Sequence, residues 1–260
     1  MKSIILAVAI MLFSTFVFAE VTMKIDEGAS GTSLIFSEGK NELGRQTYDS
    51  AGTYITTKGK IPDGSYKVFY KDGKTVSQEF TFKAGQKILE KTFTEEGLLK
   101  YEAEYKAGFL DGKKTSYYFK EKIPMLVINY KKGKKDGTTV SYFQNGSVEY
   151  EENYKADEKQ GKRKAFFVGG TVESEEAYRD DVKDGPWKKY WENGKVRGEA
   201  LYKNGAPVGV FKSYHDNGKI ETEANYKNGV LEGTMRTYDA DGKITAEEVY
   251  KNNRLVKKIK

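Results

Sequence analysis

The chain contains one histidine and no cysteine, which limits the chemistry that its side chains could perform. His215 stands at an offset where sister segments of the chain carry Trp191 and Phe143, and no arrangement of catalytic partners surrounds it. Zinc sites need clusters of cysteine or histidine, which this composition cannot supply. We therefore expect no catalytic residue, no cofactor and no metal site, and we interpret His215 as a solvated residue beside a turn.

Two short motifs resemble sites for ions or phosphates. The segment Asp239–Ile244, with Glu248 after it, overlaps the end of an EF-hand loop, but the first ligand position would fall on Thr237. The triplet Gly73–Thr75 lacks the upstream glycine of a phosphate-binding loop. Both motifs are therefore interpreted as plain turns.

A glutamate stands three residues before an aromatic position again and again, and it is the most regular charged residue of the chain. Its copies are Glu79, Glu102, Glu151, Glu175, Glu199, Glu223 and Glu247. Such a row could form a binding ladder, but lysine and arginine residues that could face it recur as well, at Lys188, Lys212 and Arg236. Cross-strand ion pairs are worth about 0.2–1 kcal/mol each, so we expect the row to be paired surface charge.

These positions recur because the chain repeats itself every 24 residues. The repeat is marked by Tyr130, Tyr154, Tyr178, Tyr202, Tyr226 and Tyr250. Self-similarity at 20 to 50 residues indicates a repeat array. We expect about eight units over residues 57–249, an N-terminal cap with a degenerate copy over residues 20–56, and a partial repeat with a basic tail over residues 250–260.

Two glycine positions divide each unit into strands. The first follows asparagine or a similar residue, and Asn-Gly between alternating segments indicates a hairpin with a primed turn, which needs positive φ. Its copies are Gly146, Gly170, Gly194, Gly218 and Gly242. The second glycine is expected to end the connection between hairpins. Its copies in the regular units are Gly137, Gly161, Gly185, Gly209 and Gly233.

Apolar and charged residues alternate along the second strand of each unit. Ile220, Ala224 and Tyr226 share one parity, and glutamate and lysine residues occupy the other. This period of two indicates one buried and one solvated face. We expect an all-β fold, an elongated single twisted antiparallel sheet built as a meander of serial β-hairpins. Aromatic residues such as Trp187 and Tyr190 are expected to stack across repeats as a continuous core.

The consensus G-x-W/F-x-x-Y-x-x-N/D-G-K-I/V-x-x-E-x-x-Y-K-N/D-G resembles the variant MORN repeat of bacteria. The stretch WKKYWENGKVRGEALYKNG, at Trp187–Gly205, is a close match, and the resemblance covers residues 57–251. It implies serial β-hairpins in one elongated sheet. Many similar proteins are labelled as antitoxins of toxin–antitoxin pairs, and MORN repeats also accompany lipid kinases. The kinase motifs are missing from this sequence, so no kinase activity is implied.

The first residues follow a different pattern. A short positive start, the apolar run Ile4–Phe18 and the small residue Ala19 are typical of a secretory signal peptide cleaved before Glu20. The run is short for a membrane span, which needs about 20 residues, although an uncleaved anchor remains the alternative. We expect an extracytoplasmic protein, in the periplasm, at the cell surface or secreted. Such a location fits poorly with an antitoxin that acts on a cytosolic toxin.

The net charge of +6 is a small excess over many interspersed charges of both signs. Nucleic-acid binding needs a concentrated basic face and is not expected. We expect a non-enzymatic scaffold for a protein partner, with binding of a glycan or an anionic membrane surface as the alternative and an antitoxin-like inhibitor as a third. Oligomeric state stays open. Residues that depart from the consensus are the candidate partner contacts, and these are Phe143, Tyr150, Phe167, Trp191 and His215.

Overall fold

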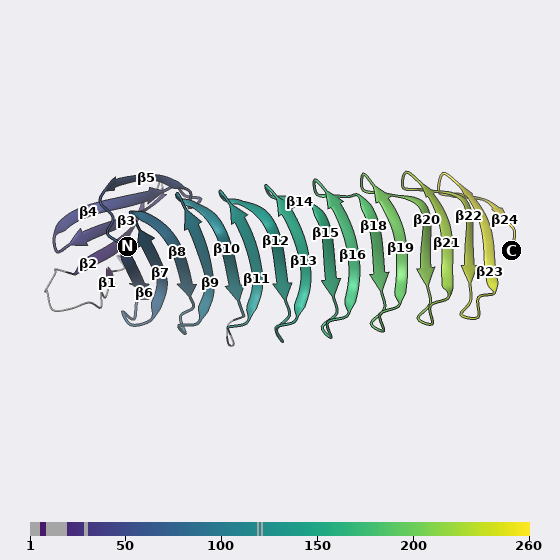
Figure 1. The fold of residues 1–260 in the computed structure, drawn as a ribbon, viewed down its shortest axis with the longest axis horizontal. Helices are drawn as coiled ribbons and strands as arrows, with labels where there is room; N and C mark the ends of the chain where they lie inside the picture. The colour runs from purple at the N-terminus through teal and green to yellow at the C-terminus, as the bar shows by residue number, and fades with distance from the viewer. Residues whose placement is uncertain (1–5, 9–19, 29–30, 119, 121) are drawn as a thin grey trace. The chain divides into compact units, whose positions relative to one another are not determined.

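The computed structural model describes residues 6–8, 20–28, 31–118, 120 and 122–260, and every regular element in this part of the chain is a β-strand (Figure 1). The predicted signal peptide lies mostly outside the described residues. No helix in the described part is long and apolar enough to cross a membrane. The chain forms two compact units, unit 1 (residues 1–134) and unit 2 (residues 135–260).

Unit 1 contains eleven of the strands, and most of them pair antiparallel with the next strand along the chain. They are β1 (Leu6–Val8), β2 (Val21–Gly28), β3 (Gly31–Glu38), β4 (Asn41–Tyr48), β5 (Tyr54–Gly59), β6 (Gly64–Phe69), β7 (Val76–Lys83), β8 (Gln86–Phe93), β9 (Leu99–Lys106), β10 (Phe109–Tyr117) and β11 (Pro124–Lys131). Strand β1 pairs with both β2 and β6. The meander β2–β5, the cap meander, therefore connects through β1 to the hairpins that follow.

The cap meander packs against the first hairpins and forms the core of unit 1. Figure 1 shows β3 and β4 crossing the direction of β6–β9. Met23 and Phe36 are fully buried there. The Phe36 ring meets Tyr66 and Phe82 edge to face, at centroid distances of 5.0 and 4.9 Å. Leu34 and Phe36 lie buried in β3, and the predicted cap boundary at residue 56 falls inside β5.

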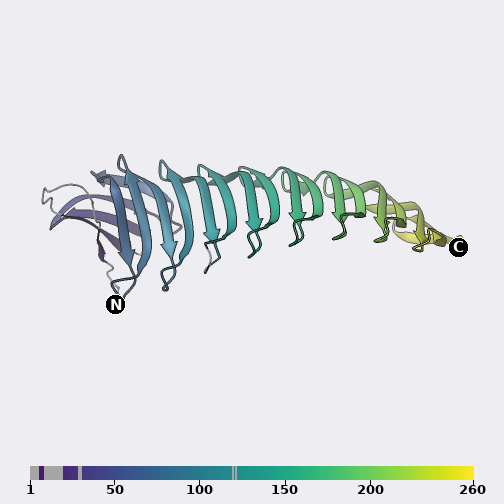
Figure 2. The same ribbon diagram turned by 60° about the horizontal axis from the view of Figure 1, so that its bottom comes forward.

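Unit 2 is a continuous antiparallel meander of hairpins (Figure 2). Its strands are β12 (Lys134–Tyr142), β13 (Val148–Lys155), β14 (Glu158–Lys159), β15 (Gly161–Phe166), β16 (Val172–Arg179), β17 (Val182–Lys183), β18 (Gly185–Tyr190), β19 (Val196–Lys203), β20 (Ala206–Tyr214), β21 (Ile220–Lys227), β22 (Val230–Tyr238), β23 (Ile244–Lys251) and β24 (Arg254–Lys258). The predicted all-β fold of serial antiparallel hairpins is confirmed in both units.

The turn inside each repeat is a hairpin turn, but it is not the primed type that the sequence suggested. In the turn between β20 and β21, Gly218 has φ 89° whereas Asn217 keeps a negative φ. The Asn217 side chain instead accepts the Lys219 N–H at 2.9 Å. The primed geometry occurs at the other Asn-Gly, between β19 and β20, where Asn204 and Gly205 have φ of 49° and 80°. The prediction assigned the primed turn to the wrong Asn-Gly pair.

The second glycine position follows its prediction in some repeats only. Gly161 and Gly185 are the first residues of β15 and β18 and therefore end the connection, as predicted. Gly209 lies inside β20 and Gly233 inside β22, so neither ends a connection. Both have positive φ, and the pairing register of each strand with its predecessor shifts beside them. Such a shift is a β-bulge, a place where glycine adopts a conformation that other residues avoid.

Replacing Gly218 by valine tests how independent the hairpins are. An added Cβ would meet nothing closer than Lys195 Cδ at 3.6 Å, so the cost is backbone strain at positive φ, about 1–3 kcal/mol. We expect faster amide hydrogen exchange in β20 and β21 with protection retained in β15 and β16. Asp216→Val, in the same turn at negative φ, is the control and should change little. Uniform loss of protection across unit 2 would contradict this independence.

Candidate functional site

A row of alternating charges crosses the strands of unit 2. The register pairs Lys188 with Glu199 on one side, and Glu199 with Lys212 on the other. The same pattern continues through every neighbouring hairpin. The row, called here the charge row, consists of Lys164, Glu175, Lys188, Glu199, Lys212, Glu223, Arg236 and Glu247. The glutamates predicted to recur in unit 2, including Glu151 opposite Lys164, therefore stand across from cations of adjacent strands, as expected.

The closest ion pair of the charge row lies at its C-terminal end, and the next closest, Lys164 Nζ to Glu175 Oε1 at 3.3 Å, lies at its other end. Arg236 Nη2 is 2.9 Å from Glu247 Oε1, and Lys212 Nζ is 3.5 Å from Glu223 Oε1. The side chains of these pairs are part-exposed, so each pair contributes little to stability by itself. The row neutralises its own charge and presents both signs to solvent at the spacing of neighbouring strands.

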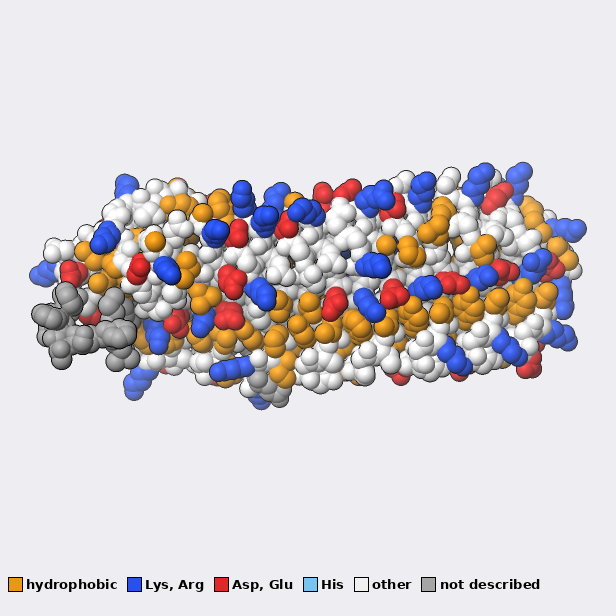
Figure 3. Space-filling model, viewed as in Figure 1, with side chains coloured by type: hydrophobic (Ala, Val, Ile, Leu, Met, Phe, Trp, Pro, Cys, Tyr) orange, Lys and Arg blue, Asp and Glu red, His pale blue; other side chains and the backbone are white. Residues whose placement is uncertain are grey.

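A band of aromatic and aliphatic side chains runs beside the charge row. In each repeat the aromatic residue that ends the first strand pairs with an aliphatic residue across the turn. The pairs, called here the aromatic band, are Tyr142–Val148, Phe166–Val172, Tyr190–Val196, Tyr214–Ile220 and Tyr238–Ile244. All ten residues are partly exposed. In the part of Figure 3 that holds unit 2, hydrophobic side chains gather in a band next to alternating basic and acidic groups.

Hydrogen bonds hold the tyrosine rings of the band against the charge row. Tyr190 Oη donates to Glu175 at 2.8 Å, and Tyr214 Oη donates to Glu199 at 2.6 Å. Burial, and then the hydrogen bond to the carboxylate, raises the pKa of each phenol to about 12. Both hydroxyls are therefore protonated donors at neutral pH, and both rings are fixed beside the row.

On the opposite face of the same strands, large aromatic residues pair with small ones. Trp187 pairs with Ala200 and Phe211 with Ala224, so a large residue stands beside a small one across each hairpin. The Trp187 and Phe211 rings stack with centroids 6.4 Å apart. Side chains three residues apart in a strand point to opposite faces. The aromatic core expected from the sequence is therefore divided between two faces, with Trp187 on one and Tyr190 on the other.

Four of the five candidate contact residues occupy one equivalent position, the residue after the band aromatic. They are Phe143, Phe167, Trp191 and His215, and each lies partly buried at a turn. Trp191 Nε1 donates to the Tyr214 carbonyl at 3.1 Å, and His215 Nε2 lies 3.0 Å from the Tyr238 carbonyl. These two side chains tie successive turns together, which gives them a structural role that the sequence did not indicate.

Tyr150, the fifth candidate, is separate from the other four. It pairs with Ala165 of β15, and the Arg163 guanidinium lies 5.2 Å from the centre of its ring. Glu151 and Lys164, the next pair in the register, lie on the face of the charge row. Tyr150 therefore lies on the opposite face. A contact with a partner remains a prediction for all five residues. The sequence did not predict the partly exposed aromatic band, because the regularly recurring aromatic residues were expected to form the core. That recurrence was the signal that could have indicated the band.

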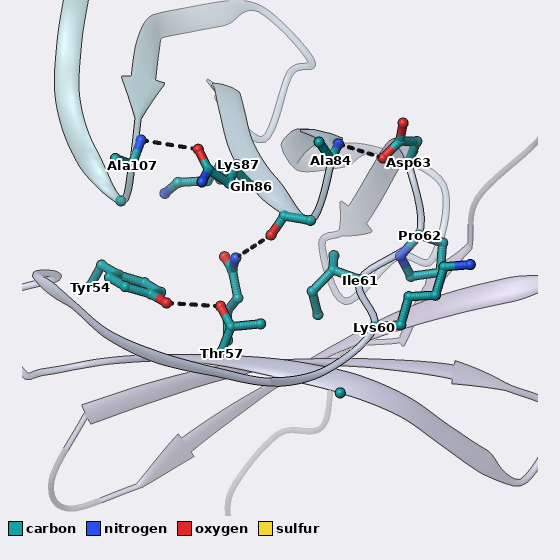
Figure 4. Close-up of a pocket in the computed structure, with 14 residues that line it drawn as sticks. Tyr54, Thr57, Lys60, Ile61, Pro62, Asp63, Ala84, Gln86, Lys87 and Ala107 are labelled. Carbon is teal, nitrogen blue, oxygen red and sulfur yellow. Dashed lines mark hydrogen bonds between the residues drawn. The ribbon is translucent and has the colours of Figure 1, made fainter.

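Unit 1 contains a cleft of about 920 Å³ between the cap meander and the hairpin turns beside it (Figure 4). Gln46 Nε2 crosses the cleft and donates to the Gly85 carbonyl at 2.9 Å. The Ala84 N–H donates to Asp63 Oδ1 at 2.7 Å, and the Tyr54 and Thr57 hydroxyls are 3.0 Å apart. The Gln46–Gly85 hydrogen bond joins the cap meander to the turn between β7 and β8. The Ala84–Asp63 bond joins that turn to the segment before β6, and the Tyr54–Thr57 contact lies within β5.

A buried ion pair lies beside this cleft. Lys87 Nζ is 2.8 Å from Glu90 Oε2, and the two side chains are only 8% and 11% exposed. The ammonium also lies 3.8 Å from the centre of the Tyr105 ring, and Tyr101 Oη donates to Glu90 at 2.8 Å. Burial by itself would raise the pKa of Glu90. The Lys87 charge and the hydrogen bonds that the carboxylate accepts outweigh burial and hold this pKa below its usual value.

Five segments of the chain match a family model described as a MORN repeat variant. The matched residues are 62–84, 135–156, 183–204, 207–228 and 231–252. Each segment spans the two strands of one hairpin, for example β20 and β21 in the fourth match. None of the curated proteins compared with the chain matches it.

Replacing Lys87 by methionine tests the buried ion pair. The change leaves the Glu90 carboxylate buried without its cation, so we expect a loss of about 3–5 kcal/mol in the free energy of unfolding by urea. The double variant Lys87→Met/Glu90→Gln should recover most of that loss. Arg45→Met, which breaks the exposed Arg45–Glu42 pair, is the control and should cost under about 1 kcal/mol. Equal losses for the two single variants would contradict the assigned burial.

The pH dependence of unfolding gives a second test of this pair. Because the pKa of Glu90 is lowered in the folded chain, the carboxylate adds stability above its unfolded pKa. That contribution disappears as pH falls through the lowered value. We expect Glu90→Gln to flatten the decline of the unfolding free energy below pH 4.5, the ordinary value for the group. An unchanged acid limb would show that Glu90 carries no such linkage.

Proposed function

Because the chain belongs to the MORN-repeat family, we propose that it is a non-enzymatic scaffold that binds another protein along its repeats, outside the cytoplasm. MORN-repeat proteins are generally non-catalytic scaffolds, and their repeats serve interaction with proteins or membrane lipids. The observation that carries the proposal is the aromatic band beside the charge row in unit 2. An array of small units that repeats one surface suits an extended partner.

The composition of this surface favours a protein over an anionic membrane. Attraction to anionic lipid relies on clustered lysine and arginine, whereas Lys188 and Lys212 of the charge row alternate with glutamates. Leu201 and Val210 are 51% and 46% exposed and stand two residues from the row along their strands. Exposed apolar groups rimmed by polar ones are typical of protein interaction sites.

A glycan is the second candidate partner, and one observation favours it. The aromatic band presents partly exposed tyrosine rings at a regular interval, and sugar rings stack on such surfaces. Export rests on the N-terminal pattern of Met1–Ala19. Both the partner class and the location are open to direct measurement in the organism that makes the protein.

A site-specific photo-crosslinker placed at Val210 tests the partner and the location together. We expect protein adducts in intact cells and in the isolated envelope, because Val210 is exposed beside the charge row. The same crosslinker at Ile55 of β5, which is 55% exposed in unit 1, is the matched control and should give none of these adducts. Adducts with glycan or lipid alone would overturn the protein-scaffold proposal. Recovery of the chain only from the cytosol would overturn export.

A further inference from the structure

The spacing of the aromatic band selects among the shapes that a protein partner can have. One aromatic residue of the band stands on every second strand, as at Tyr190, Tyr214 and Tyr238. Neighbouring strands are about 4.8 Å apart, so these rings recur about every 9.6 Å across the sheet. An α-helix rises about 1.5 Å per residue, so one heptad advances about 10.5 Å. One heptad of a helix that crosses the strands therefore corresponds to one repeat.

The sign of the charge row changes at half that distance, which matches the spacing of residues along one flank of the same helix. Its sign changes on each successive strand, from Lys188 to Glu199 to Lys212, which is about every 4.8 Å. Residues along one flank of a helix follow one another at three or four positions, or about 5 Å. A flank on which acidic and basic residues alternate would therefore meet the opposite charge at each step.

We propose that the aromatic band and the charge row of unit 2 bind an amphipathic α-helix of a partner protein, which lies across the strands with its apolar heptad positions on the band. The inference rests on the proposed function as a protein-binding scaffold and names the shape of the partner. The difference of about 1 Å between a heptad and a repeat accumulates along the band. The contact is therefore limited to about three heptads.

Other extended partners match only part of this pattern. Residues on one face of a β-strand recur about every 6.7 Å, so a strand laid across the repeats falls out of step with the tyrosines. A polyproline II helix advances about 9.3 Å per turn and matches the aromatic band. Residues on one flank of a polyproline II helix, however, recur only once per turn, so they would meet charge-row residues of one sign only. The helix is the shape that matches both spacings.

The surface is also prepared for binding before a partner arrives. The hydroxyls of Tyr190 and Tyr214 are held by Glu175 and Glu199, so neither ring has to be ordered on binding. Fixing groups beforehand lowers the entropic cost of association. The ion pairs of the charge row are part-exposed, which leaves their charges able to interact with a partner.

Three pools of displayed 21-residue peptides, each with mixed acidic and basic residues, test the inference. One pool carries leucine at heptad a and d positions, the second alternates apolar and polar residues, and the third carries proline at every third position. The full chain is the bait. We expect enrichment of the heptad pool, and we expect peptides from it to bind at least tenfold more weakly to the double variant Tyr190→Lys/Tyr214→Lys.

Two further variants separate loss of the surface from loss of the fold. Tyr190→Phe/Tyr214→Phe keeps both rings and should retain peptide binding within about threefold, since each hydroxyl that it removes is already bonded within the protein, to Glu175 or Glu199. Val256→Lys changes a residue that is 57% exposed on β24, outside the band, and should leave binding unchanged. The lysine variant keeps a polar group beside Glu175 and Glu199, which the native hydroxyls contact. Its circular dichroism and unfolding curve are compared with those of the native chain to test that it is folded.

Each remaining outcome overturns a defined part of the argument. Enrichment of the alternating or proline pool, with loss on the lysine variant, would overturn the helix and leave the protein-binding scaffold intact. Helical peptides that bind both tyrosine variants equally would show that the aromatic band is not the site. Binding of a glycan array with no enrichment of any peptide pool would overturn both the inference and the proposed function.

Discussion

The hydrogen-bond register between successive strands is the constraint on which unit 2 depends. A constant repeat of 24 residues places each glutamate of the charge row opposite a cation of the next strand, as with Glu199 and Lys212. Side chains alternate between faces, so a slip of one residue would move every charge and every ring to the other side of the sheet. The turns reinforce the register, since Trp191 and His215 each bind a backbone carbonyl of the next turn.

Unit 1 is held together by a second layer of strands in addition to its register. Its cap meander covers the first hairpins and buries Met23 and Phe36 completely, whereas the strands of unit 2 rely on contacts within one sheet. Burial in unit 1 is deep enough to enclose the Lys87–Glu90 pair among tyrosine rings. A buried ion pair is weak evidence for stability because desolvation opposes the attraction. Both members of this pair lie on β8, and the cap contacts the pair through the Tyr48 ring, whose centre is 4.9 Å from Lys87 Nζ.

The surface proposed for binding follows directly from this architecture. Alternating charges that neutralise one another leave no concentrated field to attract nucleic acid or anionic lipid. The apolar band beside them contributes area that a partner can bury, and the row contributes orientation, since complementary charge mainly sets specificity and association rate. A repeated pattern with two spacings constrains the partner to a shape with the same two spacings, whatever its identity.

The sequence by itself determined the repeat period, the hairpins, and the positive φ at Gly218 and its copies. It also determined the pairing of glutamates with cations. Each of these features depends on residues close together in the chain or on one repeated offset. The tertiary structure decided what depends on register and on distant contacts. Asn193-Gly194 and Asn204-Gly205 are the same dipeptide, yet only the second forms a primed turn, because the flanking strands pair directly up to Lys203 and Ala206.

The division of Trp187 and Tyr190 between two faces likewise depends on the register that fixes which side chains share a surface. The role of Trp191 depends on the next turn, where the Tyr214 carbonyl accepts its indole N–H. The Lys87–Glu90 cluster needed the cap to fold over it, because its enclosing ring from Tyr48 comes from a segment that no local pattern connects to β8. Contacts between segments far apart in the sequence are set by packing, and packing has no signature in a single repeat.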